Sequence, residues 1–139
     1  MSIKKVQAEN TEDFVVKAEA DGFSYTLDYA SRNPNKKSMG TSPTGLLLNS
    51  LAGCQLITAR SFFIRQNINV NTLKVDITGD FNYKNDAWVL EADAVLKIDV
   101  DLDEQQIDGL TKFIDRYCTV SGVLSAGNTI NLTIENISG

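Results

Sequence analysis

Two cysteines, Cys54 and Cys118, have the widest chemical repertoire in this sequence, and they stand 64 positions apart. A cysteine thiolate is a nucleophile, a metal ligand and an oxidisable group. Two isolated cysteines cannot complete a zinc or iron–sulfur site, and in a reducing compartment they are not expected to form a standing structural disulfide. They are therefore either inert packing residues or a redox pair.

Several other kinds of chemistry are excluded. The sequence has no histidine, which removes Ser-His-Asp and Cys-His catalysis and the commonest zinc ligand. Gly40 and Gly45 have the spacing of phosphate-loop glycines, but Leu46 and Leu47 stand where lysine and serine or threonine are needed. Acidic residues between positions 99 and 104 lack the glycine and distal glutamate of a calcium loop, so helix capping explains them better. No metal or cofactor is expected.

Length and charge favour a single soluble domain spanning residues 1–139. The formal net charge of −5 does not attract phosphate, so nucleic acid is not an expected partner. The N-terminus turns polar before an apolar stretch of signal-peptide length can form. The apolar run LLLNSLAGCQLITA is short and interrupted by Asn49, Ser50 and Gln55. We expect a cytoplasmic protein that does not span a membrane.

A long helix is predicted to carry Cys54. Ser42 suits the N-cap and Pro43 the first helical position, so the helix should run from here to about Gln66. Before it, strict alternation predicts a hairpin with one buried face, preceded by a short strand near residues 3–8. The alternating residues are Phe14, Val16, Ala18 and Ala20, then, after an Asp21-Gly22 turn, Phe23, Tyr25, Leu27 and Tyr29.

A second helix is predicted to end at or just before Cys118. Asp101 and Glu104 resemble a capping box at its start, and apolar residues then recur at helical spacing up to Tyr117. Between the two helices, alternation over residues 73–77 and 90–100 predicts a second hairpin that turns near residues 84–86. A short helix over residues 119–124 and a last strand follow. That strand is marked by Ile130, Leu132 and Ile134.

Two motifs at this separation resemble those of the OsmC/Ohr family, the osmotically inducible and organic hydroperoxide resistance proteins. They are GTSPTGLLLNSLAGC, ending at Cys54, and YCTVSGVL, around Cys118. The resemblance covers about residues 14–135. It implies an α+β fold with two groups of antiparallel strands around a long central helix, and an intertwined homodimer. It also implies thiol peroxidase activity towards organic hydroperoxides.

The resemblance assigns a role to each cysteine. Cys54 matches the peroxidatic cysteine, whose thiolate is oxidised to a sulfenic acid, and Cys118 matches the resolving cysteine that condenses with it to a Cys54–Cys118 disulfide. In the hydroperoxide resistance branch a dithiol, such as a lipoylated protein, reduces this disulfide. No cofactor is implied.

Activation of Cys54 is where the sequence departs from the family. Cys54 lies about 16 Å along the helix from Pro43, beyond reach of the helix dipole, so a nearby cation is the expected source of a lowered pKa. Thr44 replaces the glutamate that holds the family's activating arginine, and Thr119 replaces the proline usual after the second cysteine. Arg32 is a substitute candidate. With the cation loosely held, slow alkylation of Cys54 is expected.

Two function classes remain open. The first is a cysteine-dependent peroxidase; the second is a non-catalytic or weakly active protein that binds a small apolar molecule in the dimer cleft. Without the resemblance, Cys54 would be read as a packing residue, because it shares a helix face with Leu47, Leu51 and Thr58. The apolar stretch around residues 46–59 is too large for one chain of this size to cover, which favours a homodimer.

Overall fold

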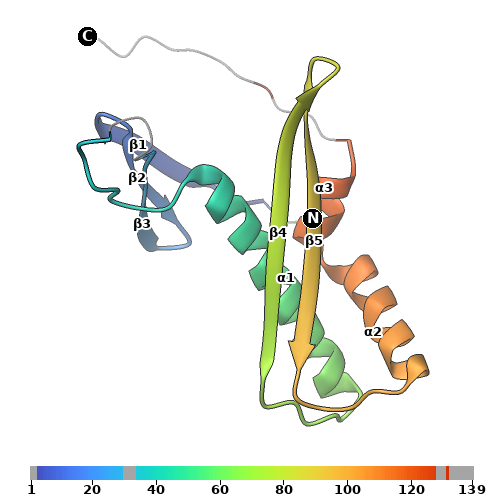
Figure 1. Cartoon of the computed structure of the whole chain (residues 1–139). Helices are drawn as coiled ribbons and strands as arrows, with labels where there is room; N and C mark the ends of the chain where they lie inside the picture. The colour runs from blue at the N-terminus through green and yellow to red at the C-terminus, as the bar shows by residue number, and fades with distance from the viewer. Residues whose placement is uncertain (1–2, 30–33, 128–130, 132–139) are drawn as a thin grey trace. The chain divides into compact units, whose positions relative to one another are not determined.

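The computed structural model describes residues 3–29, 34–127 and 131. The chain divides into two compact units, Met1–Ser50 and Leu51–Gly139, and the division falls inside the long helix α1. The described elements follow one another in this order (Figure 1): β1 (Val6–Glu12), β2 (Val15–Ala20), β3 (Phe23–Leu27), α1 (Pro43–Arg65), β4 (Leu73–Lys84), β5 (Ala87–Ile98), α2 (Glu104–Tyr117) and α3 (Thr119–Ser125).

The first unit contains an antiparallel sheet in the order β1-β2-β3. The predicted Asp21-Gly22 turn joins β2 to β3, and both of its residues have positive φ angles, 53° and 81°. That conformation costs glycine little and is tolerated by aspartate, so this dipeptide favours a tight hairpin. The hairpin is confirmed, and the preceding strand exists but lies at Val6–Glu12, later than the predicted residues 3–8.

The predicted buried face of this hairpin is only partly correct. Ala18 is buried, but Phe14 and Phe23 are 48% and 76% exposed, and Val15, assigned to the opposite face, is 2% exposed. A register shift between Asn10 and Glu12 disturbs the pairing of β1 with β2 next to Val15. A bulge of this kind re-aims side chains and breaks the simple alternation.

The start of α1 agrees with the prediction. The Gly45 amide donates to the Ser42 hydroxyl at 3.1 Å, and Pro43 is the first helical residue. The helix is 23 residues long and, by length and composition alone, apolar enough to cross a membrane. Core helices of soluble proteins meet the same criterion. Its last two turns supply buried residues to the core of the second unit.

The second unit contains a two-stranded ribbon, β4–β5, paired without interruption from Leu73↔Ile98 to Lys84↔Ala87. Asn85 and Asp86 form the turn with φ angles of 52° and 63°, as the sequence predicts. One face of the ribbon is apolar along its whole length, because cross-strand partners place matching residues on the same side. These pairs are Leu73/Ile98, Val75/Leu96, Ile77/Ala94, Phe81/Leu90 and Tyr83/Trp88.

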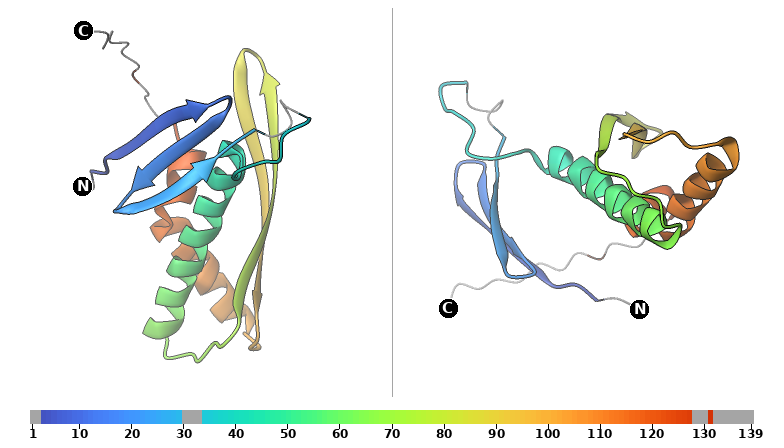
Figure 2. Two further views of the ribbon diagram at one scale, coloured as in Figure 1. Left: turned by 90° about the vertical axis from the view of Figure 1, so that its left-hand side faces the viewer. Right: turned by 90° about the horizontal axis from the view of Figure 1, so that it is seen from below.

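The core of the second unit joins α1, α2 and the ribbon. Its buried members are Ala59, Phe62, Phe63, Val70 and Leu110, and the partly buried residues packed against them come from both strands and from α2. The rings of Phe62 and Phe63 meet edge to face, with centroids 5.6 Å apart. Figure 2 shows the C-terminal part of α1 beside the ribbon and α2. This packing fixes α1, which carries Cys54, against α2, which ends just before Cys118.

The capping box of α2 lies two residues later than predicted. The Gln106 amide donates to the Asp103 carboxylate at 2.7 Å, and the Gln106 side chain accepts from the Asp103 amide at 2.9 Å. The sequence offers two aspartates near this helix start, and Asp103 rather than Asp101 has the side-chain partner. The predicted short helix is confirmed as α3, whereas the predicted last strand lies outside the described residues except for position 131.

Candidate active site

Cys54 lies in the middle of α1, where the backbone is fully helical. It is half-buried and its thiol is free. Leu51 and Thr58, one turn before and one turn after it, are buried. Residues three and four apart lie on one helix face, so Cys54 belongs to the inward face of α1.

Cys118 lies at the joint between two helices. Its φ and ψ angles of −76° and 101° are not helical, so α2 ends before it and α3 begins after it. Its amide donates to the Ile114 carbonyl at 2.9 Å, and its carbonyl accepts from the Gly122 amide at 3.0 Å. The side chain is 2% exposed. Cys118 therefore serves as C-cap of one helix and N-cap of the next.

The fold brings the two cysteines together. Their side chains are hydrogen-bonded to each other, and neither is in a disulfide. Cys54 and Cys118 come from elements that are far apart in sequence, and the packing of α1 against α2 makes them neighbours. Such a pair has the proximity that thiol–disulfide chemistry needs.

The pKa of the Cys54 thiol is lowered. Burial, the largest single influence, raises the pKa, but four hydrogen bonds together outweigh it. The donors are the Val120 backbone, the Cys118 thiol, the Thr119 backbone and the Thr58 hydroxyl. Thr119 and Val120 are the first residues of α3, where backbone N–H groups have no partner within the helix. These N–H groups favour a negative charge on the Cys54 sulfur.

The pKa of the Cys118 thiol is raised. Burial is the main cause, and the hydrogen bond and negative charge of Cys54 raise the pKa further, against the lowering effect of the Ser121 and Val120 backbone. Of the two cysteines, Cys54 therefore ionises first. Cys118 stays protonated and can donate to the Cys54 thiolate.

The expectation that a cation must activate Cys54 is not met in the described part of the chain. No arginine contributes to its lowered pKa there. Arg60 donates to the Val70 carbonyl at 2.7 Å, and the guanidinium groups of Arg65 and Arg116 lie over aromatic rings. Arg32 lies outside the described residues. Within the described residues, the backbone of Thr119 and Val120 and the side chains of Cys118 and Thr58 lower the pKa of Cys54. The role of Arg32 stays a prediction.

Thr44, the residue at the family's glutamate position, belongs to the first turn of α1. Its hydroxyl lies 3.3 Å from the Ser42 hydroxyl.

Over residues 3–29, 34–127 and 131, no three acidic, cysteine or histidine side chains are grouped closely enough to hold a metal ion.

The structure is thus an α+β protein in which two free cysteines lie next to each other and differ in pKa. The model of the family described as OsmC-like protein matches residues 34–133, and the chain belongs to this family. A relative from Mycoplasma pneumoniae named hydroperoxide reductase is 27% identical over a 136-residue alignment, and the match covers 93% of this chain and 94% of the relative.

Solved structures show the same fold. The crystal structure of an OsmC-like protein from Mycoplasma pneumoniae has a TM-score of 0.76 and 27% identity, covering 89% of this chain and 88% of that one. An organic hydroperoxide resistance protein OsmC from Legionella pneumophila has a TM-score of 0.67, covers 89% and 90%, and is 17% identical, so it supports the fold alone. The predicted α+β, OsmC-like fold is confirmed.

Proposed function

We propose that this protein is a cysteine-dependent peroxidase that reduces organic hydroperoxides in oxidative stress defence. The observation that carries the proposal is the hydrogen-bonded pair of free thiols, with the pKa of Cys54 lowered and that of Cys118 raised. The name of the Mycoplasma pneumoniae relative, hydroperoxide reductase, supports the same class of reaction.

In the first step the Cys54 thiolate attacks one oxygen of the hydroperoxide ROOH. A sulfur–oxygen bond forms as the oxygen–oxygen bond breaks, and RO⁻ takes a proton to leave as the alcohol ROH. Sulfur is oxidised to the sulfenic acid Cys54–SOH, and the peroxide is reduced. The lowered pKa of Cys54 raises the fraction of thiolate available near neutral pH.

In the second step Cys118 resolves this intermediate. Its thiol condenses with Cys54–SOH to form the Cys54–Cys118 disulfide and release water. The interaction between the Cys54 and Cys118 side chains supports this condensation. A dithiol, such as a lipoylated protein, then reduces the disulfide and is itself oxidised to a disulfide. A cytoplasmic location, where thiol reductants are abundant, suits this cycle.

Mass spectrometry of the reduced protein tests this function directly. One equivalent of cumene hydroperoxide should remove about two mass units per chain, the two hydrogens lost on disulfide formation, and a dithiol should restore them. Wild-type protein that keeps two free thiols after prolonged exposure to several hydroperoxides would rule out the peroxidase.

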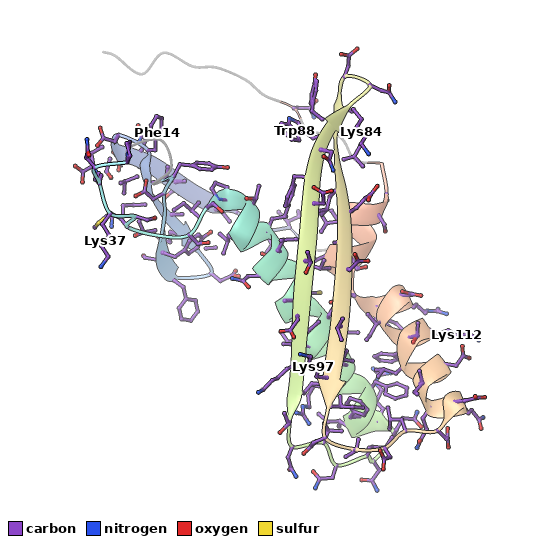
Figure 3. The ribbon with its side chains drawn as sticks, in the orientation of Figure 1. Phe14, Lys37, Lys84, Trp88, Lys97 and Lys112 are labelled. Carbon is purple, nitrogen blue, oxygen red and sulfur yellow. The ribbon has the colours of Figure 1, made fainter. Side chains whose placement is uncertain are left out.

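We further propose that the protein works as a homodimer. The apolar ribbon face is uncovered near its turn, where Tyr83 and Trp88 are 59% and 71% exposed with ring centroids 5.4 Å apart (Figure 3). On α1, Ile57 and Ile64 are 75% and 70% exposed. Exposed apolar side chains of this size commonly mark a protein interface. Light scattering should give twice the mass of one chain at micromolar concentration, and a monomer mass would contradict the dimer.

A specific observation also favours the alternative, binding of a small apolar ligand. The second unit has a cavity of about 480 Å³ that is lined mainly by apolar side chains of the ribbon and α2, with Gln55 from α1. A cavity of this size and lining can hold a small apolar molecule. Ligand binding that persists in Cys54→Ser protein, together with no hydroperoxide-dependent disulfide in the wild type, would favour this second function.

A further inference from the structure

Thr58 is a buried hydroxyl one helical turn after Cys54. It is 8% exposed, and its Oγ1 donates to the Cys54 carbonyl oxygen at 2.7 Å. In helices, threonine side chains lean back over the preceding turn, which brings the hydroxyl close to residue 54. Such a bond to the carbonyl four residues earlier adds little stability by itself. Its position beside a candidate nucleophile gives it a second possible partner.

The Thr58 hydroxyl lies within hydrogen-bonding reach of the Cys54 sulfur as well as of the Cys54 carbonyl. A hydroxyl has one proton, so a strong bond to one acceptor weakens the bond to the other. The Cys54 carbonyl lies inside α1 and can accept from the helix backbone without the hydroxyl. Turning the hydroxyl from the carbonyl to the sulfur therefore leaves no buried group without a partner.

We propose that Thr58 is a positioning residue for Cys54, whose hydroxyl donates to the carbonyl oxygen while Cys54 is a thiol and turns to the sulfur when the thiolate forms. The donors from α3 approach the sulfur from a different element, whereas Thr58 is fixed to the same helix as Cys54. It therefore orients the thiolate relative to its own backbone. Thr58 neither touches nor transfers atoms to the peroxide.

The contribution of Thr58 to turnover rests on the proposed peroxidase function, but its effect on the thiolate does not. A hydrogen bond to the charged form stabilises that form, so the hydroxyl increases the thiolate fraction at a given pH. As sulfur bonds to oxygen it loses its charge, and the hydroxyl can return to the carbonyl. The thiolate can therefore be tested without any hydroperoxide.

The experiment measures the rate of Cys54 alkylation by iodoacetamide against pH, with the modified peptide identified by mass spectrometry. Thr58→Val keeps the shape of the side chain but removes the hydroxyl, and Thr58→Ser keeps the hydroxyl. The midpoint of the curve of alkylation rate against pH gives the pKa of Cys54. We expect Thr58→Val to lower the rate roughly fivefold to twentyfold at pH values below the wild-type midpoint, and to raise that midpoint. Thr58→Ser should keep the wild-type midpoint.

Thr111→Val is the matched control, because the Thr111 hydroxyl makes the same kind of bond to the Ile107 carbonyl, 2.9 Å, on α2. It should leave the Cys54 midpoint unchanged. Thermal unfolding verifies that each variant is folded, and Thr58→Ala replaces Thr58→Val if the latter is not. Equal midpoints for wild type and the folded hydroxyl-free variant, or an equal shift in Thr111→Val, would overturn the proposal.

The two proposals fail in different ways. If hydroperoxide forms no disulfide but the midpoint shifts in Thr58→Val, the peroxidase function is wrong and the role of Thr58 stands. If the disulfide forms normally and the midpoint does not shift in Thr58→Val, the proposed role of Thr58 is wrong and the peroxidase function stands.

Discussion

Cys54 and Cys118 carry the same side chain on two different kinds of backbone. Cys54 lies inside a 23-residue helix, where the surrounding amides are engaged in the helix itself. Cys118 lies at a joint, and the helix after it begins with N–H groups that have no helical partner. The joint nevertheless favours the charge on Cys54, because Thr119 and Val120 donate to the Cys54 sulfur.

This difference shows that the position of Cys54 and the lowered pKa of its thiol depend on different elements. The interior of α1 holds Cys54 rigidly, and the break between α2 and α3 supplies the donors that lower its pKa. Because Cys118 forms that break, the candidate resolving residue also helps to activate its partner.

Exchanging each cysteine for serine has the largest expected effect. Cys54→Ser should lose hydroperoxide reduction completely, because no other thiol near the site has a lowered pKa among the described residues. Cys118→Ser should still be oxidised once, at Cys54, and its sulfenic acid should be trapped by dimedone. Trapping on Cys118 in the Cys54→Ser protein at a comparable rate would show that the two roles are reversed.

Removing core packing between α1 and α2 should come next in size. Phe63 is fully buried in the core that joins α1 to α2, so Phe63→Ala should lower the free energy of unfolding by about 3–5 kcal/mol. Urea denaturation measures this change. Lys112→Ala is the control, since Lys112 projects from α2 (Figure 3) and its ion pair with Asp108 is exposed, so that solvent screens it and it contributes little to stability. Similar losses in both variants would contradict the assigned core.

Much of the fold could be predicted because it follows from local signals. Asp21-Gly22 turns the chain between β2 and β3, and Ser42-Pro43 begins α1, both at the positions that the sequence predicts. The errors arise where two local options compete. Asp101 and Asp103 are both acceptable caps, and the register shift of β1 next to Val15 is a property of paired strands. Neither choice can be read from one segment alone.

The candidate site could be predicted in part, for the same reason. Side chains with distinctive chemistry identify Cys54 and Cys118, and the resemblance links them. The groups that lower the pKa of Cys54 include backbone N–H groups of Thr119 and Val120, which every residue except proline possesses. Residue types therefore do not reveal them. Thr58, a common residue on an apolar helix face, gives no stronger signal.

The pH dependence of alkylation measures the difference between the two cysteines. Cys54 has a lowered pKa, so its rate should rise at pH values below the ordinary thiol pKa of about 8.5 and then level off. Cys118 has a raised pKa and should react only above that range. Peptide mass spectrometry after iodoacetamide treatment near pH 7 should show at least about tenfold more label on Cys54. The slow labelling expected from the missing glutamate would instead give nearly equal rates.

Thr119→Pro should have the smallest effect on the reactivity of Cys54. It tests whether the α3 backbone causes the difference in pKa between the two cysteines. Proline has no N–H, so one of the two backbone donors from α3 to the Cys54 sulfur is lost. Residue 119 is the first residue of α3, where proline is well tolerated, so the helix should persist. With Val120 still donating, Cys54 alkylation near pH 7 should slow by roughly three- to tenfold.

The corresponding controls separate this effect from a general disturbance. Cys118 labelling above pH 9 should change little in Thr119→Pro, because Ser121 and Val120 rather than Thr119 donate to the Cys118 sulfur. An unchanged Cys54 rate in a folded Thr119→Pro protein would show that this amide does not stabilise the thiolate. The substitution also restores the residue usual after the second cysteine in the family. A slower Cys54 in that variant would therefore indicate that Thr119 partly compensates, through its backbone, for the glutamate that Thr44 replaces.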